Sequence, residues 1–311
     1  MKKSTWISGY VKTMLSNRFN HDFFVDRRRL ISADDAAIQI RNALLSEEPY
    51  MVGRFGAFES QAILQADGVI TGVCKRVTNN IVEHLNMNAG VFPKGEDMVL
   101  RFAEYMEQYV PDVDLLGYWQ GGAGGYVAEN YLTRKTVLTK LANIEPFYAS
   151  FPWTDSLRGQ KVLVIHPYKQ SILHQYEKRN LVFPTTESGE ILPEMNLSVL
   201  EAVQTIANVR DERFTDWFDA LDYMYDQAML INPKIVIIGC GAYGFPLAAR
   251  LKRAGKQVIH LGGAVQLLFG IQGKRWERNV IVQSYVNDNW IRPLEQEKPI
   301  GADRIENGCY W

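Results

Sequence analysis

The sequence predicts an α/β protein with a Rossmann-like, doubly wound and mostly parallel sheet, helices on both of its faces, and an N-terminal helical lead-in. Three observations predict this class. Short apolar runs rich in β-branched residues alternate with stretches of helical period along most of the 311 residues. The run 235–238 has no polar side, which is typical of a strand buried on both faces of a parallel sheet. It leads directly into a glycine turn and a helix, as in a right-handed βαβ unit.

Two segments are expected along the chain. Residues 1–30 form the lead-in, and residues 31–311 form one Rossmann-like domain with a seam near 150–159. No short-period repeat and no low-complexity tract interrupts the domain. The alternation of strands and helices is more regular after the seam than before it.

The lead-in is expected to be a surface helix that packs on the domain through an apolar side made of Trp6, Tyr10, Met14 and Phe19. Three consecutive arginines at 27–29 end it. This basic end leaves two further roles open, which are peripheral contact with lipid headgroups and contact with another copy in a homo-oligomer.

Before the seam, Ser32 is a good N-cap for a helix that ends near Pro49, because its hydroxyl can accept a hydrogen bond from the first turn. The segment 79–90 is expected to be irregular, and the glycine run 121–125 is expected to be a mobile loop. Periodicity predicts the other elements of this half: a strand and turn over 50–56, helices over 58–66 and 95–109, and a strand over 113–119.

After the seam, strands and helices alternate up to the central unit. The predicted elements are strands over 161–165 and 198–206, and helices over 170–179 and 215–230. The central unit comprises the strand 235–238, a helix over 243–254 that stops at Gly255, and a strand over 257–261. A short apolar helix over 265–269 then leads into the segment 270–276.

Composition excludes several classes of protein. A net charge of −1 provides no general attraction to nucleic acid, so no nucleic-acid partner is expected. The three cysteines, Cys74, Cys240 and Cys309, fit neither a disulfide framework nor a zinc motif, which indicates a reducing compartment. No stretch has the roughly 18 apolar residues of a spanning helix, and the first 20 residues are not a signal peptide. We therefore expect a cytoplasmic protein, with the inner face of the membrane as an alternative location.

Gly239, Gly241 and Gly244 have the G-x-G-x-x-G spacing. Such a turn directs backbone N–H groups and a helix N-terminus at one place, which suits phosphate. A dinucleotide site also needs an acidic residue about 20 positions further on, where it binds the ribose. The second strand here ends in the segment 260–263 (His-Leu-Gly-Gly), without a carboxylate. We interpret the turn as a nucleotide or nucleotide-sugar site and expect no NAD. There are two alternatives: the protein could be an NAD(P)-dependent oxidoreductase, or the glycines could be required only for close packing.

Candidate site residues follow predicted strands, because ligands of parallel α/β sheets gather at the carboxyl ends of strands. Cationic groups beside the glycine turn suit a diphosphate. The candidate diphosphate-binding residues are Gly239, Gly241, Ala242, Tyr243, Gly244, Gly262, Gly263, Lys274 and Arg275. The candidate catalytic residues are Glu59, Arg54 and His166.

Each catalytic candidate has a structural alternative. Glu59 could bind a divalent metal, act as a base, or only complement the helix dipole in a first turn. His166 ends a strand before a proline, where a hydrogen-bonded structural histidine is at least as well supported as a catalytic one. His174 is expected on a helix surface. Asp112 and Asp114 form a D-x-D sequence, but they precede a strand and so lie at the wrong end of the sheet.

Several stretches together resemble a known family. They are Gly-Arg-Phe-Gly-Ala-Phe-Glu at 53–59, Leu-Val-Ile-His-Pro-Tyr at 163–168, the turn 239–246, the segment 261–276, and the ending 306–311. They resemble the GT-D-fold glycosyltransferases, which are bacterial proteins of capsule, O-antigen and adhesin-glycan synthesis. The resemblance covers most of residues 50–311 and is more specific in the second half.

The resemblance implies transfer of a hexose from a nucleotide-diphosphate sugar, most often a UDP-sugar, to a hydroxyl acceptor on a glycan, glycoprotein or lipid-linked molecule. It also implies a D-x-E motif that holds manganese, which maps onto Ala57, Phe58 and Glu59, with alanine in place of the aspartate. Three alternatives follow. Glu59 could hold Mn²⁺ or Mg²⁺ with help from pyrophosphate and water; the protein could instead use Arg54, Lys274 and Arg275 without metal; or it could bind nucleotide sugars without catalysis.

Overall fold

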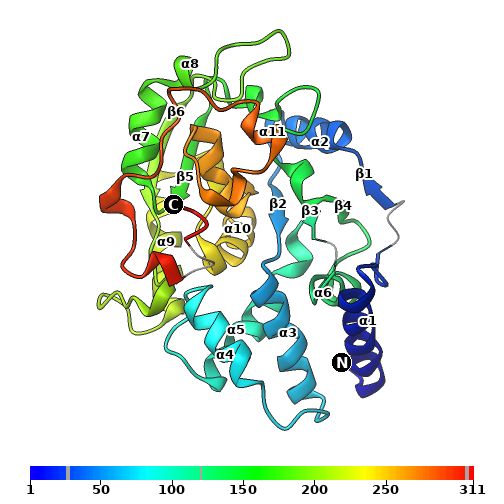
Figure 1. Ribbon diagram of the computed structural model, residues 1–311. Coiled ribbons are helices and arrows are strands. Elements are labelled where there is room, and N and C mark those ends of the chain that lie inside the picture. Colours follow the sequence, from blue (N-terminus) through cyan, green and yellow to red (C-terminus); the bar gives the residue numbers. More distant parts are fainter. Residues whose placement is uncertain (26–28, 120, 305–307) are drawn as a thin grey trace.

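The computed structural model describes residues 1–25, 29–119, 121–304 and 308–311. Its strands are β1 Leu30–Ile31, β2 Tyr50–Arg54, β3 Leu115–Tyr118, β4 Val137–Lys140, β5 Lys161–His166, β6 Asn196–Glu201, β7 Ile235–Ile238 and β8 Gln257–His260. They form one sheet in the order β1-β4-β3-β2-β8-β7-β5-β6, and every described pair of neighbours is parallel (Figure 1). The predicted class of a parallel α/β sheet is therefore confirmed.

Helices cover both faces of the sheet. The α-helices are α1 Lys3–Phe19, α2 Ala33–Leu45, α3 Ala57–Ile70, α4 Asn79–Met87, α5 Glu96–Glu107, α6 Gly124–Tyr131, α7 Lys169–Glu177, α8 Arg179–Val182, α9 Trp217–Ile231, α10 Gly244–Arg253 and α11 Val280–Gln283. The 3₁₀ helices are η2 Val110–Asp112, η3 Leu141–Ile144, η4 Trp153–Leu157, η5 Ile206–Asn208, η6 Gly241–Tyr243, η7 Gly262–Phe269, η8 Lys274–Trp276, η9 Glu295–Glu297 and η10 Ala302–Arg304.

The strands contribute alternate side chains to two hydrophobic cores. In β7, Val236 and Ile238 pack into the core beneath α3, α5, α9 and α10, on what we call the first face. Ile235 and Ile237 pack into the other core, beneath α2, α7 and η7, on the second face. The period of two places every side chain of β7 in apolar surroundings, which explains why this run has no polar side.

The connections that leave the carboxyl ends of the strands go to both faces of the sheet. The chain leaves β2 and β7 into α3 and α10 on the first face, whereas it leaves β5 and β8 into α7 and η7 on the second face. Ligands of doubly wound sheets bind where such connections part, beyond the carboxyl ends of the strands. In Figure 1 this end of the sheet lies at the lower end of β2, above α3 and α4, and the C-terminus returns to the middle of the molecule.

Helix α1 packs on the domain as expected, but through a different side. Its buried residues are Trp6, Gly9, Thr13 and Ser16. Tyr10, Met14 and Phe19 of the predicted apolar side are exposed, so that part of the prediction is wrong. Small residues allow a close approach, and Gly9 lies directly against the ring of Tyr126 in α6. Within the described ranges, no helix is long and apolar enough to cross a membrane.

Other predicted elements need correction. The segment 79–90 is not wholly irregular, because α4 buries Ile81 and Leu85 one turn apart. The glycine run 121–125 is not wholly a loop, since α6 begins at Gly124. The short strands β1 and β4, the first two in the sheet order, had no counterpart in the prediction. Some residues of these predictions lie outside the described part of the chain. They are two arginines of the predicted basic end, at 27 and 28, and residues 306–307 of the predicted ending.

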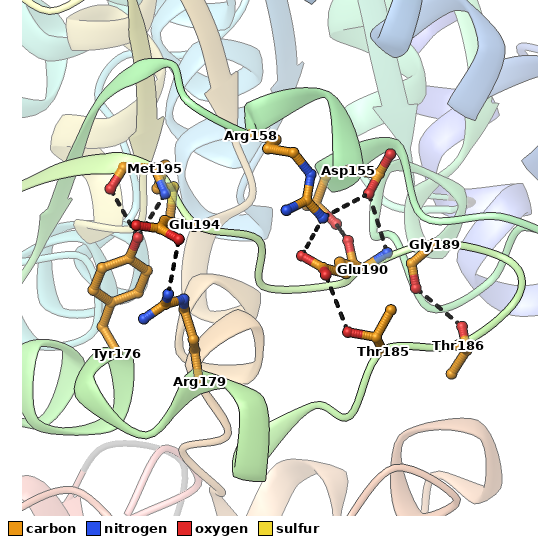
Figure 2. Close-up of polar contacts among 11 residues, drawn as sticks. Asp155, Arg158, Tyr176, Arg179, Thr185, Thr186, Gly189, Glu190, Glu194 and Met195 are labelled. Carbon is orange, nitrogen blue, oxygen red and sulfur yellow. Dashed lines mark hydrogen bonds and ion pairs between the residues drawn. The ribbon is translucent and has the colours of Figure 1, made fainter.

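The segment 150–159, where a seam is predicted, contains η4 and is tied to the connection between β5 and β6 (Figure 2). Arg158 forms ion pairs with Glu190 and Asp155, and Asp155 also accepts a hydrogen bond from the backbone of Glu190. Further along, the Tyr176 hydroxyl donates a hydrogen bond to the carbonyl of Met195 and accepts one from the N–H of the same residue. Strands from both sides of this segment belong to one sheet, because β2 pairs with β8.

Two acidic side chains, Asp67 of α3 and Glu107 of α5, lie close together on the first face; Asp67 is buried and Glu107 is partly buried. Asp67 accepts hydrogen bonds of 2.7 Å from the hydroxyls of Tyr126 and Tyr131. Burial, and then the charge of Asp67, raise the pKa of nearby Glu107 from 4.5 to about 7. Because the folded protein holds this proton more tightly than the unfolded chain, the stability of the fold decreases as the pH rises from about 4.5 to about 7.

We expect Glu107→Gln to raise the free energy of unfolding at pH 8 by about 1–2 kcal/mol, allowing for the partial exposure of this side chain. The gain should decrease as the pH falls through 7, where the wild-type carboxyl becomes protonated. Urea unfolding at a series of pH values measures this. Glu104→Gln, an exposed neighbour on α5 whose charge raises the pKa of Glu107 less than burial and Asp67 do, is the comparison and should give a much smaller gain. A gain that is the same at pH 5 and pH 8 would contradict the assignment.

Candidate functional site

A cavity of about 200 Å³ lies at the carboxyl ends of the four central strands β2, β8, β7 and β5, and we call it the first cavity. It is formed by segments far apart in sequence, including the ends of these strands, the residues after α4 and the C-terminus. Of the sequence-predicted site residues, those that line it are Arg54, Glu59, His166, Gly239, Gly241, Ala242, Tyr243, Gly262, Gly263 and Arg275. Gly244 and Lys274 are not in this lining.

The three glycines of the G-x-G-x-x-G turn serve different purposes. The N–H of Gly239 donates to Ile165 within the sheet, and a Cβ here would lie 2.5 Å from the carbonyl oxygen of Gly262. Gly241 has a φ of +58°, which favours glycine. A Cβ at Gly244 would overlap the imidazole of His260. Close packing therefore accounts for the first and third glycines, and backbone conformation accounts for the second.

The turn also presents backbone donors to the first cavity. Among the described residues, no acceptor is found for the N–H groups of Cys240, Gly241 and Ala242. They precede α10, whose N-terminus adds partial positive charge at the same place. Such a nest of N–H groups suits a phosphate. The Tyr243 side chain does not take part, because it stacks on Trp217 at 5.0 Å and is buried.

Arg54, the last residue of β2, brings a cation to this cavity. Its Nη1 donates to the carbonyl of Leu261, 3.4 Å away. Burial lowers the pKa of the Arg54 guanidinium, and the charges of Glu145 and Glu59 act in the opposite direction. Arg275 lines the same cavity, and its positive charge also lowers the pKa of Arg54. Two neighbouring guanidinium groups suit a ligand with more than one negative charge.

Glu59 lies in the first turn of α3, and its carboxylate folds back over Gly56, where a Cβ would overlap it. It contributes the one carboxylate side chain among the described residues of the lining. Ala57 is exposed and provides no ligand. In the described part of the chain, no group of three or more histidine, cysteine, aspartate or glutamate side chains could hold a metal ion. These donors therefore do not fit a manganese or magnesium ion held mainly by the protein.

Two buried histidines line the cavity, and neither is suited to accept a proton. Burial lowers the pKa of both His166 and His260 to about 3. The Tyr168 backbone N–H donates to Nδ1 of His166, which leaves the ring proton on Nε2. His166 can thus donate a hydrogen bond to a ligand. Nδ1 of His260 is buried without a partner among the described atoms, and this ring packs against Gly244.

Residues near the C-terminus form a wall that the strand pattern did not predict. Tyr310 packs against Gly263, and its hydroxyl accepts a 2.7 Å hydrogen bond from Arg275. The ring of Trp311 lies 6.3 Å from that of Tyr168. The family resemblance of the ending was the one signal for these residues, and it assigned them no role. Lys274 is exposed and extends towards Gly308, outside the lining.

Glu145 was also missed. It follows η3 after strand β4, is only 9% exposed, and its Oε2 has no partner among the described atoms. Burial raises the pKa of its carboxyl to about 7, although Arg54 lowers it. The charges of Glu145 and Arg54 thus affect each other. Strand β4, which leads to Glu145, was not predicted, so the sequence contained no indication that Glu145 approaches Arg54.

Two expectations about residues outside the site are confirmed. Asp114 pairs with Lys252 at 2.7 Å and accepts a hydrogen bond from the backbone N–H of Met51. These contacts lie at the opposite end of β2 from the cavity. Asp112 pairs with Arg253. The D-x-D sequence thus has a structural role. His174 is exposed on α7.

No family model matches the chain, and no curated protein matches it. Two solved structures are similar to it, each with a TM-score of 0.42 and with coverage of 86% of this chain and 92% of theirs. The first, 11% identical, is a selenomethionine-substituted structure of domain of unknown function 1792. The second, 10% identical, is of the same domain, described as having a distinct glycosyltransferase fold.

Proposed function

We propose that the protein is a glycosyltransferase that moves a hexose from a nucleotide-diphosphate sugar, with UDP as the nucleotide, to a hydroxyl acceptor in polysaccharide or glycoconjugate synthesis. The observation that carries the proposal is one cavity that joins an anion-binding turn, two guanidinium groups and a single carboxylate. A leaving diphosphate needs the first two features, and an attacking hydroxyl needs the third. The motif resemblance supplies the hexose and the UDP.

In this proposal the diphosphate lies between the N–H groups of the turn at 240–242 and the guanidinium groups of Arg54 and Arg275. The acceptor oxygen forms a bond to C1 of the hexose as the bond from C1 to the phosphate oxygen breaks. The electron pair of that bond leaves with the diphosphate, and the acceptor proton passes to the Glu59 carboxylate. The guanidinium groups stabilise the negative charge that develops on the leaving group.

Glu59 is the better of the two candidate bases on structural grounds. Nδ1 of His166 already accepts a hydrogen bond, and its pKa of about 3 makes it a weak base. We further propose that the two guanidinium groups replace the metal that the family resemblance implies, because Glu59 has no second carboxylate beside it in the described lining. An oxidoreductase is less well supported, since β8 ends at His260, where a dinucleotide site has its acidic ribose ligand.

Calorimetric titration with UDP, in manganese and then in EDTA, tests this function, with NAD as the control ligand. We expect UDP to bind with similar affinity in both buffers. UDP binding that requires manganese would restore a metal at Glu59 and refute the metal-free arrangement. Binding of NAD and not of UDP would overturn the transferase proposal.

The same titration separates two neighbouring cations. Arg275→Ala should weaken UDP binding by about tenfold or more, because it removes a charge-assisted contact from the cavity. Lys274→Ala is a matched control, because its side chain lies outside the lining, and it should leave affinity within about twofold. Equal effects of the two variants would show that a diffuse field, and not a contact with Arg275, attracts the nucleotide.

A further inference from the structure

A second cavity, of about 470 Å³, lies next to the first. Helices α1, α3 and α4 and the residues that follow β3 surround it. Gly56, Ala57, Phe58 and Trp119 line both cavities, so the two share a wall. The proposed function assigns no role to this space.

The two cavities differ in charge. Arg54, Glu59 and Arg275 line the first one, whereas no lysine, arginine, aspartate or glutamate is found among the described residues of the second. Its polar side chains are amides such as those of Asn17, Gln61 and Asn80, together with hydroxyls and the imidazole of His84. A phosphate or a carboxylate bound here would lack a counter-charge, so the lining favours an uncharged ligand with many hydroxyl groups.

Several of these polar groups are available to a ligand. Among the described residues, the side chains of Gln61 and Asn80 have no hydrogen-bond partner, although both belong to the wall. The Asn17 side-chain oxygen accepts a 2.9 Å hydrogen bond from the N–H of Gly122, which fixes the glycine segment and leaves its amide N–H groups for other acceptors. Primary amides can both donate to and accept from sugar hydroxyls.

Aromatic rings complete the wall. Trp119 lines both cavities and is 48% exposed, so its ring is accessible to a ligand. Phe58 is held in place by His84, whose ring stacks on it at 4.8 Å and 13°. Flat apolar faces beside amide groups match the two kinds of surface that a pyranose presents, its C–H faces and its hydroxyl rim.

The shared wall places this cavity beside the reacting group. The Glu59 carboxylate lies over Gly56, and Gly56 belongs to both linings. A sugar in the second cavity can therefore direct a hydroxyl at Glu59 while the donor occupies the first. We infer that the second cavity binds the acceptor, and that the acceptor presents an uncharged sugar unit there; this inference rests on the proposed transferase function.

The test uses the full chain with UDP present and a panel of free methyl glycosides as probes: glucoside, galactoside and N-acetylglucosaminide, with the charged glucuronide for comparison. Saturation-transfer NMR at millimolar glycoside detects weak binding. We expect at least one neutral glycoside to bind, and the glucuronide to bind more weakly. Failure of every neutral glycoside to bind, or a preference for the glucuronide, would overturn the inference.

Variants locate the bound sugar. Asn80→Ala and Gln61→Ala should each weaken binding of the neutral glycoside by about threefold to tenfold, since each removes a hydrogen-bonding group. Asn79→Ala, an exposed neighbour in the same turn that lines neither cavity, is the matched control. Trp119 is less suitable because it lines both cavities. Unchanged binding in both cavity variants would place the sugar elsewhere and refute the site.

UDP affinity, measured on the same variants, separates this inference from the proposed function. We expect Asn80→Ala and Gln61→Ala to bind UDP as the wild type does. If UDP binds and the glycosides do not, the acceptor site is wrong and the transferase proposal stands. If glycosides bind and UDP does not, the sugar site stands as a binding site, and the transferase proposal fails.

Discussion

Replacement of Glu59 by glutamine is expected to lower the rate of hexose transfer by about 10²–10⁴-fold, the usual contribution of a positioned general base. Glutamine has nearly the same shape, so it can occupy the space over Gly56, but it cannot accept the acceptor proton. UDP affinity should change by much less than the rate, because the variant retains Arg54, Arg275 and the turn. Initial rates with saturating UDP-glucose and an acceptor glycoside, beside UDP titration, measure both quantities.

A second variant tests whether the position of this carboxylate matters as well as its charge. Gly56 has ordinary extended dihedral angles (φ −80°, ψ 155°), so its backbone tolerates alanine. The added methyl group would nevertheless occupy the place of the Glu59 carboxylate. Gly56→Ala should therefore lower the rate strongly while leaving the fold stable. Wild-type rates in Glu59→Gln would remove this residue from the mechanism, and wild-type rates in Gly56→Ala would show that its position over Gly56 is not the reactive one.

The sequence predicted most strands of the sheet but not β1 and β4. β5, β7 and β8 are short β-branched runs buried on both faces, and that burial leaves a clear pattern. Strands β1 and β4 are two and four residues long and only partly buried, so they leave no such pattern. For α1, the prediction followed the large apolar residues, whereas packing used Gly9 and other small residues that permit close contact.

The same physical reason separates the predicted from the missed parts of the site. Arg54, His166 and the glycine turn follow strands, and parallel strands bring their carboxyl ends to one edge. Glu145 approaches the site from the segment after β4 and η3, and Tyr310 from near the C-terminus, and no local spacing encodes such an approach. Lys274 shows the opposite error, since its neighbour Arg275 lines the cavity and Lys274 does not.

Gly244→Ala is expected to lower the free energy of unfolding by about 2–4 kcal/mol, even with no ligand present, since overpacking at a buried site is costly. The added methyl group would overlap the imidazole of His260, which is 5% exposed and has no room to move outward. Gly241→Ala provides the comparison: it should cost about 1 kcal/mol through its positive φ alone, because its nearest neighbour would be the Ala89 carbonyl oxygen at 3.8 Å.

His260→Ala distinguishes the two causes. It removes the ring that Gly244→Ala would strike, so the alanine at 244 should cost at least about 1 kcal/mol less in the His260→Ala background than in the wild type. The cost of Gly241→Ala should be the same in both backgrounds. Urea unfolding of the ligand-free proteins measures all of these values. Independent effects of the changes at 244 and 260 would mean that the third glycine is not there for packing, and its role would then have to come from the bound phosphate.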